Sequence, residues 1–360
     1  MTILSEIHAL VDKFGLFDRE WFTYFKNLDT SVASNTTNIA SNTANIALLQ
    51  LRFGYSSSML NGTLVATVAS NNLTVAIKTL AGNDPSVTDP VYLIFRNSNT
   101  TLGNFTVITL TAAFSFTVNS GNTLGFANAI PGRLWVVAFN DAGTARLGLI
   151  NCVNGYSFPA GVYPLYEGDQ FVNSTGGNGG NSSGVFYTGT AVTAKPYIIL
   201  GYLEWNSALA TAGTWNATPG YIALFGPGVK KPGDVVQSTF GATGVQSSTT
   251  GTSFVSSATS ASINVSSAVN PVRARSSVNT GVDNSGNYCQ IQLYDGSNAI
   301  SSAFTALCTT GSVFRTGFIL EAADYPGAGS HTYVIKFASG TAGQNAVCGP
   351  GTMFIDEIMG

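Results

Sequence analysis

Hydrophobic and polar positions follow two different periods along the chain, and the change falls near residue 54. In residues 3–27 apolar side chains recur three or four positions apart, which is typical of an amphipathic helix. After Gly54, short runs rich in Val, Ile, Thr and Phe are separated by Gly, Asn, Asp and Pro, which is typical of strands joined by turns. The pattern predicts a helical N-terminus followed by a mainly β chain.

A seven-residue repeat, SNTTNIA-SNTANIA, occupies residues 34–47 and predicts a short coiled coil over residues 31–54. With Ile at heptad position a and Leu or Asn at d, the core positions are Leu28, Val32, Asn35, Ile39, Asn42, Ile46, Leu49 and Phe53. Ile at a is compatible with dimers and trimers, and Asn layers at d specify register where identical side chains meet on an axis. The alternative is a chance repeat in a linker, because Ser, Asn and Thr are poor helix formers.

The stretch FGLFDREWFTYF, within the predicted N-terminal segment 1–30, contains six aromatic residues in twelve. Asp18 is positioned to cap a second helix. We interpret this segment as a surface that attaches the protein to a larger assembly, through Phe14, Phe17, Trp21, Phe22 and Phe25. The alternative is an aromatic plug that closes a trimer.

Two antiparallel β-sandwich-like domains are predicted behind the helix, at 55–226 and 238–360. FGPGVKKPGDVV, with three glycines and two prolines, predicts the linker 227–237 between them. Expected strands in the first domain lie within 64–70, 73–80, 90–97, 105–119, 133–140, 146–153, 185–192 and 195–205. In the second, the dipeptide DG at 295–296 predicts a hairpin, and FIDEI predicts the last strand.

Composition narrows the classes of function. Charged residues make up 9% of the 360, against about a quarter in typical globular proteins. Hydroxyls and amides must therefore supply the polar surface. The net charge is −3 without a basic block, which argues against nucleic acid as a partner, and no apolar stretch is long enough for membrane insertion. An adhesin-like composition without an export signal fits a virion protein made in the host cytoplasm and released by lysis.

The candidate catalytic patterns are weak, and we expect no catalytic residues, no metal site and no cofactor. GNSSG at 180–184 matches GxSxG, but it lies in a glycine-rich loop rather than between a strand and a helix. The carboxylate pairs Glu167/Asp169, Glu321/Asp324 and Asp356/Glu357 leave a glycosidase formally open. The segment 283–287 resembles the start of a calcium loop but lacks the closing Glu, so a turn is expected.

The four cysteines, Cys152, Cys289, Cys308 and Cys348, show no CxxC pairing that would indicate zinc. Buried thiols are expected, and a Cys289–Cys308 disulfide is the alternative. Sugar binding by β domains uses aromatic faces beside amides and hydroxyls, so Tyr288, Tyr294 and Tyr325 are the candidate receptor contacts. Tyr156, Tyr163 and Tyr166 are further candidates near predicted loops.

Two blocks of the sequence resemble tail fibre proteins of proteobacterial phages and prophages. The first runs from LNGTLVATVAS through RLWVVAFNDAGTARLGLINC and KPYIILGYLEW to FGPGVKKPGDVVQ, over roughly residues 59–237. The second begins at Asp234, ends PGTMFIDEI and is similar to C-terminal β-sandwich modules of phage fibres. The resemblance implies a homotrimeric appendage that joins tail or baseplate proteins through its N-terminus and presents its C-terminal domain outward.

Three functions are open at this point. The first is a trimeric tail fibre that binds a bacterial surface glycan or outer-membrane protein. The second is a virion decoration without a receptor, such as a head fibre, collar whisker or baseplate component. The third is a hydrolase, which the scarcity of histidine disfavours, since the chain has only two.

Overall fold

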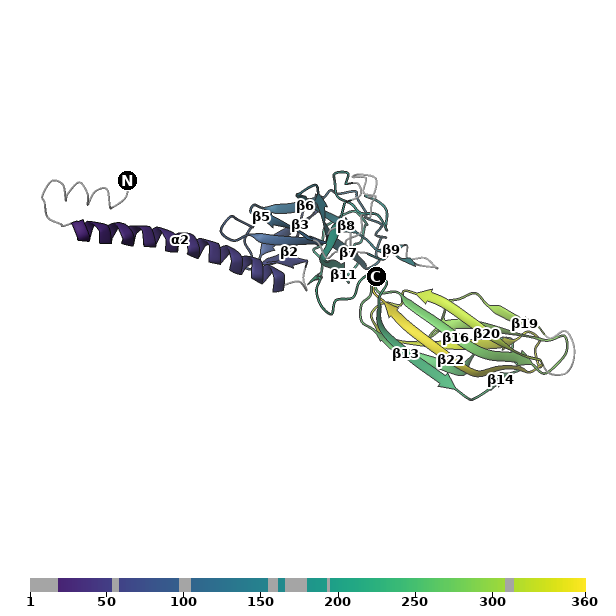
Figure 1. Cartoon of the computed structure of the whole chain (residues 1–360). Helices are drawn as coiled ribbons and strands as arrows, with labels where there is room; N and C mark the ends of the chain where they lie inside the picture. Colours follow the sequence, from purple (N-terminus) through teal and green to yellow (C-terminus); the bar gives the residue numbers. More distant parts are fainter. Residues whose placement is uncertain are drawn as a thin grey trace. The chain divides into compact units, whose positions relative to one another are not determined.

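The computed structural model describes residues 19–53, 58–96, 105–154, 161–165, 180–192, 195–307 and 314–360. The chain divides into two compact units, Met1–Ser56 and Ser57–Gly360. The described part of the first unit is a helix, and the described part of the second consists of antiparallel sheets (Figure 1). The predicted mainly β class is thereby confirmed.

Helix α2 (Arg19–Phe53) is 35 residues long and passes without a break through the expected boundary between residues 30 and 31. Its many hydroxyls do not interrupt it, because threonine side chains donate back to carbonyls four residues earlier. Thr36 Oγ1 lies 2.9 Å from the Val32 carbonyl, and Thr43 Oγ1 lies 2.8 Å from that of Ile39. The helix expected before α2 lies outside the described residues, together with Phe14, Phe17 and Asp18, the expected cap of the second helix.

The described residues of the segment 58–225 form three main sheets around a shared core, plus one short pair of strands. The first sheet has the order β1 (Met59–Leu60), β4 (Val91–Arg96), β5 (Phe105–Leu110). The second is β2 (Gly62–Ala69), β3 (Asn72–Thr79), β6 (Phe114–Val118). The third is β12 (Tyr221–Leu224), β11 (Tyr197–Trp205), β7 (Gly132–Asp141), β8 (Thr144–Ile150), and the short pair is β9 (Val153–Asn154) with β10 (Gly161–Val162).

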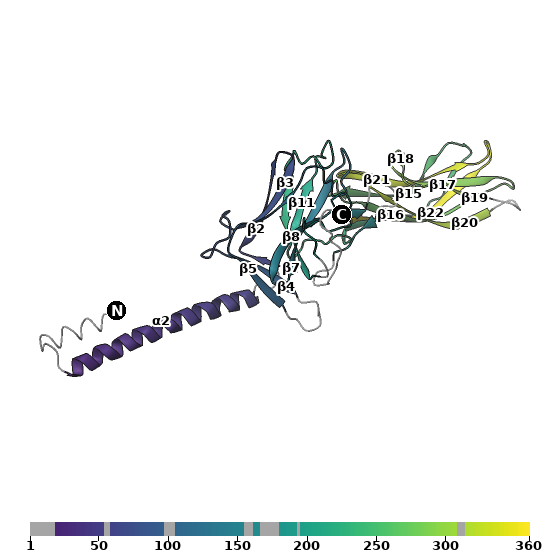
Figure 2. The ribbon, with the colours of Figure 1, turned by 90° about the horizontal axis from the view of Figure 1, so that it is seen from above.

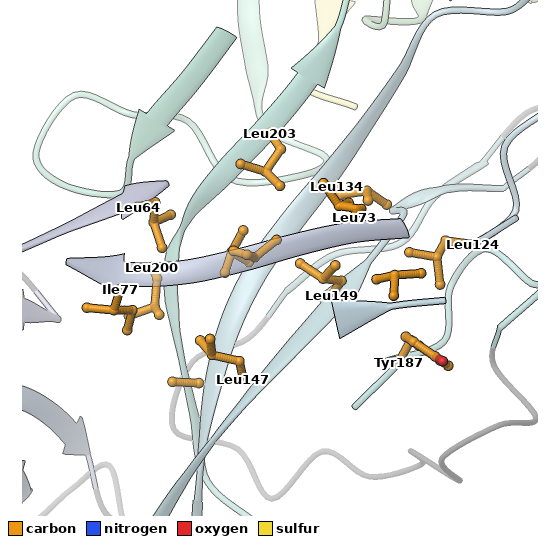
Figure 3. Close-up of a cluster of buried hydrophobic side chains, with 14 of the residues drawn as sticks. Leu64, Leu73, Ile77, Leu124, Leu134, Leu147, Leu149, Tyr187, Leu200 and Leu203 are labelled. Atoms are coloured by element: carbon orange, nitrogen blue, oxygen red, sulfur yellow. The ribbon is translucent and has the colours of Figure 1, made fainter. Parts of the chain in front are cut away.

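Strand β7 is buried on both faces, which explains its nearly continuous apolar sequence RLWVVAF. Leu134 and Val136 point into the core shared with the other two sheets, where they join Leu73, Leu149 and other residues in Figure 3. Trp135, Val137 and Phe139 point the other way, into a second cluster that includes Met359 near the chain's end. The C-terminal residues therefore pack directly against the central β segment.

Two expected strands differ from the prediction. The run 105–119 is not one strand: β5 and β6 belong to different sheets and are separated at residues 111–113. Residues 185–192 form no strand: Tyr187 makes an isolated bridge with Leu149, and Val192 also takes part in a bridge. The apolar side chains of this segment, including Phe186 and Val192, are buried by packing although the backbone forms no continuous ladder, so its composition resembles that of a strand. Strand β13 also begins at Val235, before the expected end of the linker.

The segment 235–360 is a sandwich of two five-stranded sheets. The first sheet follows the order β13 (Val235–Thr243), β22 (Ala346–Ile358), β16 (Val272–Val282), β20 (Phe314–Asp324), with β14 (Ser247–Thr249) beside β22. The second follows β15 (Val255–Val265), β21 (Gly329–Ser339), β17 (Tyr288–Asp295), β18 (Asn298–Ala299), with β19 (Phe304–Leu307) beside β17 (Figure 2).

Strict alternation builds this sandwich. Along β16 the burial alternates residue by residue from Val272 to Val278, and β15 does the same from Ser257 to Val265. Inward residues from both sheets, such as Ala274, Met353 and Phe337, form a single core. The predicted hairpin at 295–296 is confirmed, since Asp295 pairs with Asn298 across it.

Candidate functional site

The predicted heptad positions form an exposed apolar stripe along α2, here called the seam. Within the chain, Leu28 is 48% exposed, Val32 56% and Ile39 66%, and the seam asparagines Asn35 and Asn42 are exposed as well. The remaining predicted positions, Ile46, Leu49 and Phe53, belong to the helix, but their side chains lie outside the described residues. The seam positions whose side chains are described, from Leu28 to Asn42, are therefore exposed on the helix.

Part of the predicted aromatic attachment surface can be placed on the same helix. Phe25 is half-buried, and its ring meets that of Tyr24 edge to face at 5.8 Å between centroids. Trp21 and Phe22 lie in the first turns of α2, and their side chains are not described. The attachment role remains a prediction.

A second exposed apolar surface was missed in the sequence. It is the outer face of the sheet β13-β22-β16-β20, here called the aromatic face. Phe240 pairs with Phe354, Phe354 with Arg275, and Arg275 with Glu321, so one row of side chains crosses four strands. Phe240 is 55% exposed, Phe354 47%, and Ile319, one row away, 74%. The sequence signal was the strand alternation, which assigns Phe354 and Ile355 to opposite faces.

The aromatic face combines apolar contact with charge of both signs. The Phe240 and Phe354 rings contact each other with centroids 4.7 Å apart and planes tilted by 45°. A shallow groove of about 260 Å³ lies beside Phe354, lined by Arg275, Ser276, Ser277, Ile319 and Thr352. At one end of the face, Arg273 donates to Asp356 at 2.9 Å and lies 4.0 Å from Glu321.

The opposite outer face, on β15-β21-β17, is polar and is called the polar face. Its outward residues are mainly hydroxyls and amides: Ser256, Ser260, Ser262, Thr332, Gln290 and Gln292. The predicted receptor residue Tyr294 lies here, with the Lys336 ammonium 4.3 Å from its ring centroid and its hydroxyl donating to Gln292 at 3.2 Å. One face of the Tyr294 ring is thus already occupied by a cation.

The other predicted tyrosines are half-buried, and Tyr288 lies on the same outward side of β17 as Gln290 and Gln292. Tyr288, at the start of β17, packs over the backbone of Gly340, where an added Cβ would lie 2.3 Å from the ring. Tyr325 follows β20, and its backbone N–H donates to Asp324 Oδ1 at 2.8 Å. Tyr163 is also half-buried, and Tyr156 and Tyr166 lie outside the described residues. Receptor contact by these tyrosines stays a prediction.

A buried polar network links the central β segment to the last strand, and we call it the junction network. Arg133 Nε donates to Glu204 Oε2 at 2.9 Å, while its other nitrogens donate to Asn270 Oδ1 at 3.0 Å and to the Gly360 carbonyl at 2.9 Å. Asn270 in turn donates to Glu357 at 2.7 Å. Arg133 and Glu204 are both almost fully buried, so this is a structural connection rather than an accessible site.

Glu357 is fully buried and remains a carboxylate. Burial opposes ionisation, but donors from Ser266, Asn270 and Gln237 outweigh it and hold the pKa of Glu357 below its ordinary value. Its neighbour Asp356 points to the other side of β22, where it accepts hydrogen bonds from Ser238 and Arg273. The predicted carboxylate pair 356/357 is therefore split across two faces of one strand and cannot act jointly.

The other candidate catalytic groups have structural surroundings. The GxSxG segment 180–184 is a turn that packs on residues 122–125, where Asn181 Oδ1 accepts from the Thr123 amide at 3.0 Å. The suspected calcium loop is a turn, as expected, and Arg315 and Asn345 bind the carboxylate of Asp283. His331 pairs with Asp295 at 2.8 Å. Glu167 and Asp169 lie outside the described residues.

Three cysteines, Cys152, Cys289 and Cys348, are buried free thiols, as expected, while Cys308 lies outside the described residues. Cys289 is a free thiol that accepts a hydrogen bond from Thr280 Oγ1 at 2.9 Å, and its partner in the alternative Cys289–Cys308 disulfide is not among the described residues. Burial raises the pKa of Cys348 to about 12. Among the described residues, no cluster of three or more His, Cys, Asp or Glu side chains is arranged to hold a metal ion.

Comparison with known proteins gives no family. No family model and no curated protein matches the sequence. Among solved structures, a chain in the structure of infectious bursal disease virus, Gx strain, is 12% identical with a TM-score of 0.26. The match covers 84% of this chain and 77% of that chain. The VP2 subviral particle of the same virus is 9% identical with a TM-score of 0.26, and the match covers 84% of this chain and 78% of that chain. The delta-endotoxin Cry8Ea1 of Bacillus thuringiensis is 6% identical with a TM-score of 0.22, and the match covers 84% of this chain and 52% of that chain. TM-scores this low carry no structural argument.

Among the described residues, no helix has both the length and the apolar character needed to cross a membrane.

Proposed function

We propose that this protein is a homotrimeric virion appendage of the tail-fibre type, joined to the particle through its N-terminal segment and binding a receptor on the bacterial surface. One observation carries the proposal: α2 exposes Leu28, Val32 and Ile39 at core heptad positions. A single helix rich in Ser, Thr and Asn is marginal in water, so it needs a partner that covers this stripe. Other copies of α2 present the same stripe in the same register.

Three copies fit the seam asparagines better than an unrelated partner does. Asn35 and Asn42 occupy d positions on the stripe, and an amide there can donate to and accept from the same amide of a neighbouring copy. Such layers fix the register of identical helices. An unrelated apolar surface would leave both amides without partners, which is costly when they are buried.

Receptor binding is assigned to the polar face. Its serines, threonine and glutamines provide the donors and acceptors that sugar hydroxyls require, and Tyr294 adds an aromatic surface next to Lys336. Weak contacts of this kind become useful when three copies bind one cell surface together. The receptor class is therefore a surface glycan or a protein with similar polar chemistry.

Light scattering on a size-exclusion column tests the trimer. Three copies of the 37.4-kDa chain give about 112 kDa, and residues 57–360, which form a compact unit of their own, should show a weaker association. A full-length chain that stays monomeric at tens of micromolar would overturn the proposal.

Binding of the fluorescently labelled full chain to a panel of proteobacterial strains tests the receptor role. Labelling of some strains, reduced by Tyr294→Ala with Lys336→Ala, is the expected result. A trimer that labels no strain would instead favour the decoration without a receptor. Release of reducing sugar from surface polysaccharide would favour the hydrolase.

A further inference from the structure

The two outer faces of the C-terminal sandwich differ sharply in chemistry. The polar face presents hydroxyls, amides, Lys336 and the ring of Tyr294, whereas the aromatic face presents Phe240, Phe354 and Ile319 to solvent. Large apolar side chains gathered on one face of a protein with a polar surface mark an interaction site. The question is which partner covers it.

The geometry of the aromatic pair disfavours a sugar. A glycan platform needs a flat exposed ring, but Phe240 and Phe354 lean against each other with their planes tilted by 45°. Each ring covers part of the other. The resulting surface is a ridge beside the groove at Ser277 and Ile319, which suits interdigitation with apolar side chains of a protein.

The charges on the same face favour a second copy of the chain. Among the described residues, no carboxylate lies within 4.0 Å of the Arg275 guanidinium, whereas Glu321 opposite it on β20 is exposed. A face that carries a cation and an anion side by side is complementary to a rotated copy of itself, because the Arg275 of one copy can pair with the Glu321 of the next. Glu321 already has Arg273 at 4.0 Å, so a partner that carries only cations would leave Arg275 unpaired.

We propose that the aromatic face packs against the C-terminal sandwich of another copy, so that the trimer has a second interface far along the chain from the α2 seam. The inference rests on the proposed trimer: helices that associate hold the sandwiches at a high effective concentration, and a face of modest area then suffices. It also assigns directions, with the aromatic face turned toward the other copies and the polar face turned outward to the receptor.

Single cysteines in the full chain test this interface. Ser277→Cys places a thiol at the centre of the aromatic face, and Ser260→Cys, on the polar face, is the matched control, because both serines are exposed strand residues. Asn279→Cys supplies a second position on the aromatic face. All are made with Cys308→Ser, and unchanged fluorescence of the buried tryptophans verifies folding.

In the trimer, a polyethylene glycol maleimide should react with Ser277→Cys and Asn279→Cys at least about tenfold more slowly than with Ser260→Cys. A short bismaleimide should cross-link the chains through position 277 but not through position 260. Adding Ile39→Lys, which separates the helices, should bring the three labelling rates together.

The outcomes separate this inference from the proposed function. A trimer in which positions 277 and 260 react equally fast would overturn the second interface and leave the trimer standing. A monomer with equal rates would overturn both. Protection of position 277 only after a bacterial polysaccharide is added would identify the aromatic face as a ligand site and would also overturn the inference.

Discussion

At the scale of the residue, we expect a single substitution in the junction network to lower the stability of the fold strongly. Arg133 is buried, and Glu204 is the only carboxylate that the structure gives it among the described residues. Glu204→Ala leaves a buried guanidinium without its counter-charge, so we expect the free energy of unfolding to fall by about 3–5 kcal/mol. Urea denaturation followed by tryptophan fluorescence measures this change, since Trp135 lies in the same region.

The matched control is Asp84→Ala, which breaks the Lys78–Asp84 pair on the surface. Solvent screens that pair, so the expected loss is at most about 1 kcal/mol. Equal effects of the two substitutions would show that Arg133 finds another partner or water once Glu204 is gone.

The lowered pKa of Glu357 leads to a specific prediction of how stability depends on pH. Its folded-state pKa lies below the ordinary value of 4.5, so it contributes stability above that value and loses it as the pH falls through the folded pKa. The urea midpoint should therefore hold steady from pH 7 to about 5 and decline below 4.5. Glu357→Gln should lower the midpoint at pH 7 and flatten the decline, whereas Glu321→Gln, at an exposed site, should do neither. A decline as steep in Glu357→Gln as in the parent would contradict the assignment.

The pKa shift of Asp324 has the opposite effect on the pH dependence of stability. Desolvation raises its pKa, even though Tyr333 donates to it at 3.1 Å. A carboxyl with a raised folded-state pKa favours folding below its unfolded pKa and loses that contribution as the pH rises through the folded value. The contribution of Asp324 therefore offsets part of the loss from Glu357 only where the two ranges overlap, between the ordinary values of 3.8 and 4.5.

At the scale of the element, the helix carries the most direct test of assembly. Ile39→Lys places a charge on the seam of each copy and removes apolar burial of about 1.5–3 kcal/mol per side chain, so the concentration for half-association should rise at least about 10²-fold. Thr37→Lys puts the same charge on the same helix at heptad position f, away from the seam, and should leave the mass unchanged. Sedimentation over a dilution series measures both. Dissociation by both variants alike would mean that charge, rather than the seam, is responsible.

Element types were predictable where the hydrophobic period was clear. Strands such as β3 and β16 alternate strictly, and β7 is apolar because it is buried on both faces. The period failed at 185–192, where side chains are buried by packing although the backbone forms only isolated bridges, and at 111–113, where the chain changes sheets inside one apolar run. Both features depend on which distant strand lies alongside, and local composition does not carry that information.

The candidate sites were likewise predictable where they depend on local periodicity and not where they depend on the pairing of distant strands. Heptad spacing located the seam, because a helix places positions seven apart on one side. The aromatic face was not predicted from the sequence because Phe240 and Phe354 are 114 residues apart and meet only through the pairing of β13 with β22. The tyrosines were chosen for their position near loops, a signal that does not distinguish an exposed ring from one already covered by Lys336 or Gly340.

At the scale of the whole molecule, trimer formation and receptor binding make one joint prediction. If the polar face binds weakly and three copies act together, the Ile39→Lys chain should need at least about 10²-fold more protein for half-maximal labelling of a susceptible strain. Thr37→Lys should match the parent. Each isolated sandwich keeps its polar face in all three proteins, so labelling at saturation should remain equal. A half-maximal concentration that does not change in Ile39→Lys, in a sample shown to be monomeric, would mean that a single copy contains the complete binding site and that the trimer serves attachment rather than affinity.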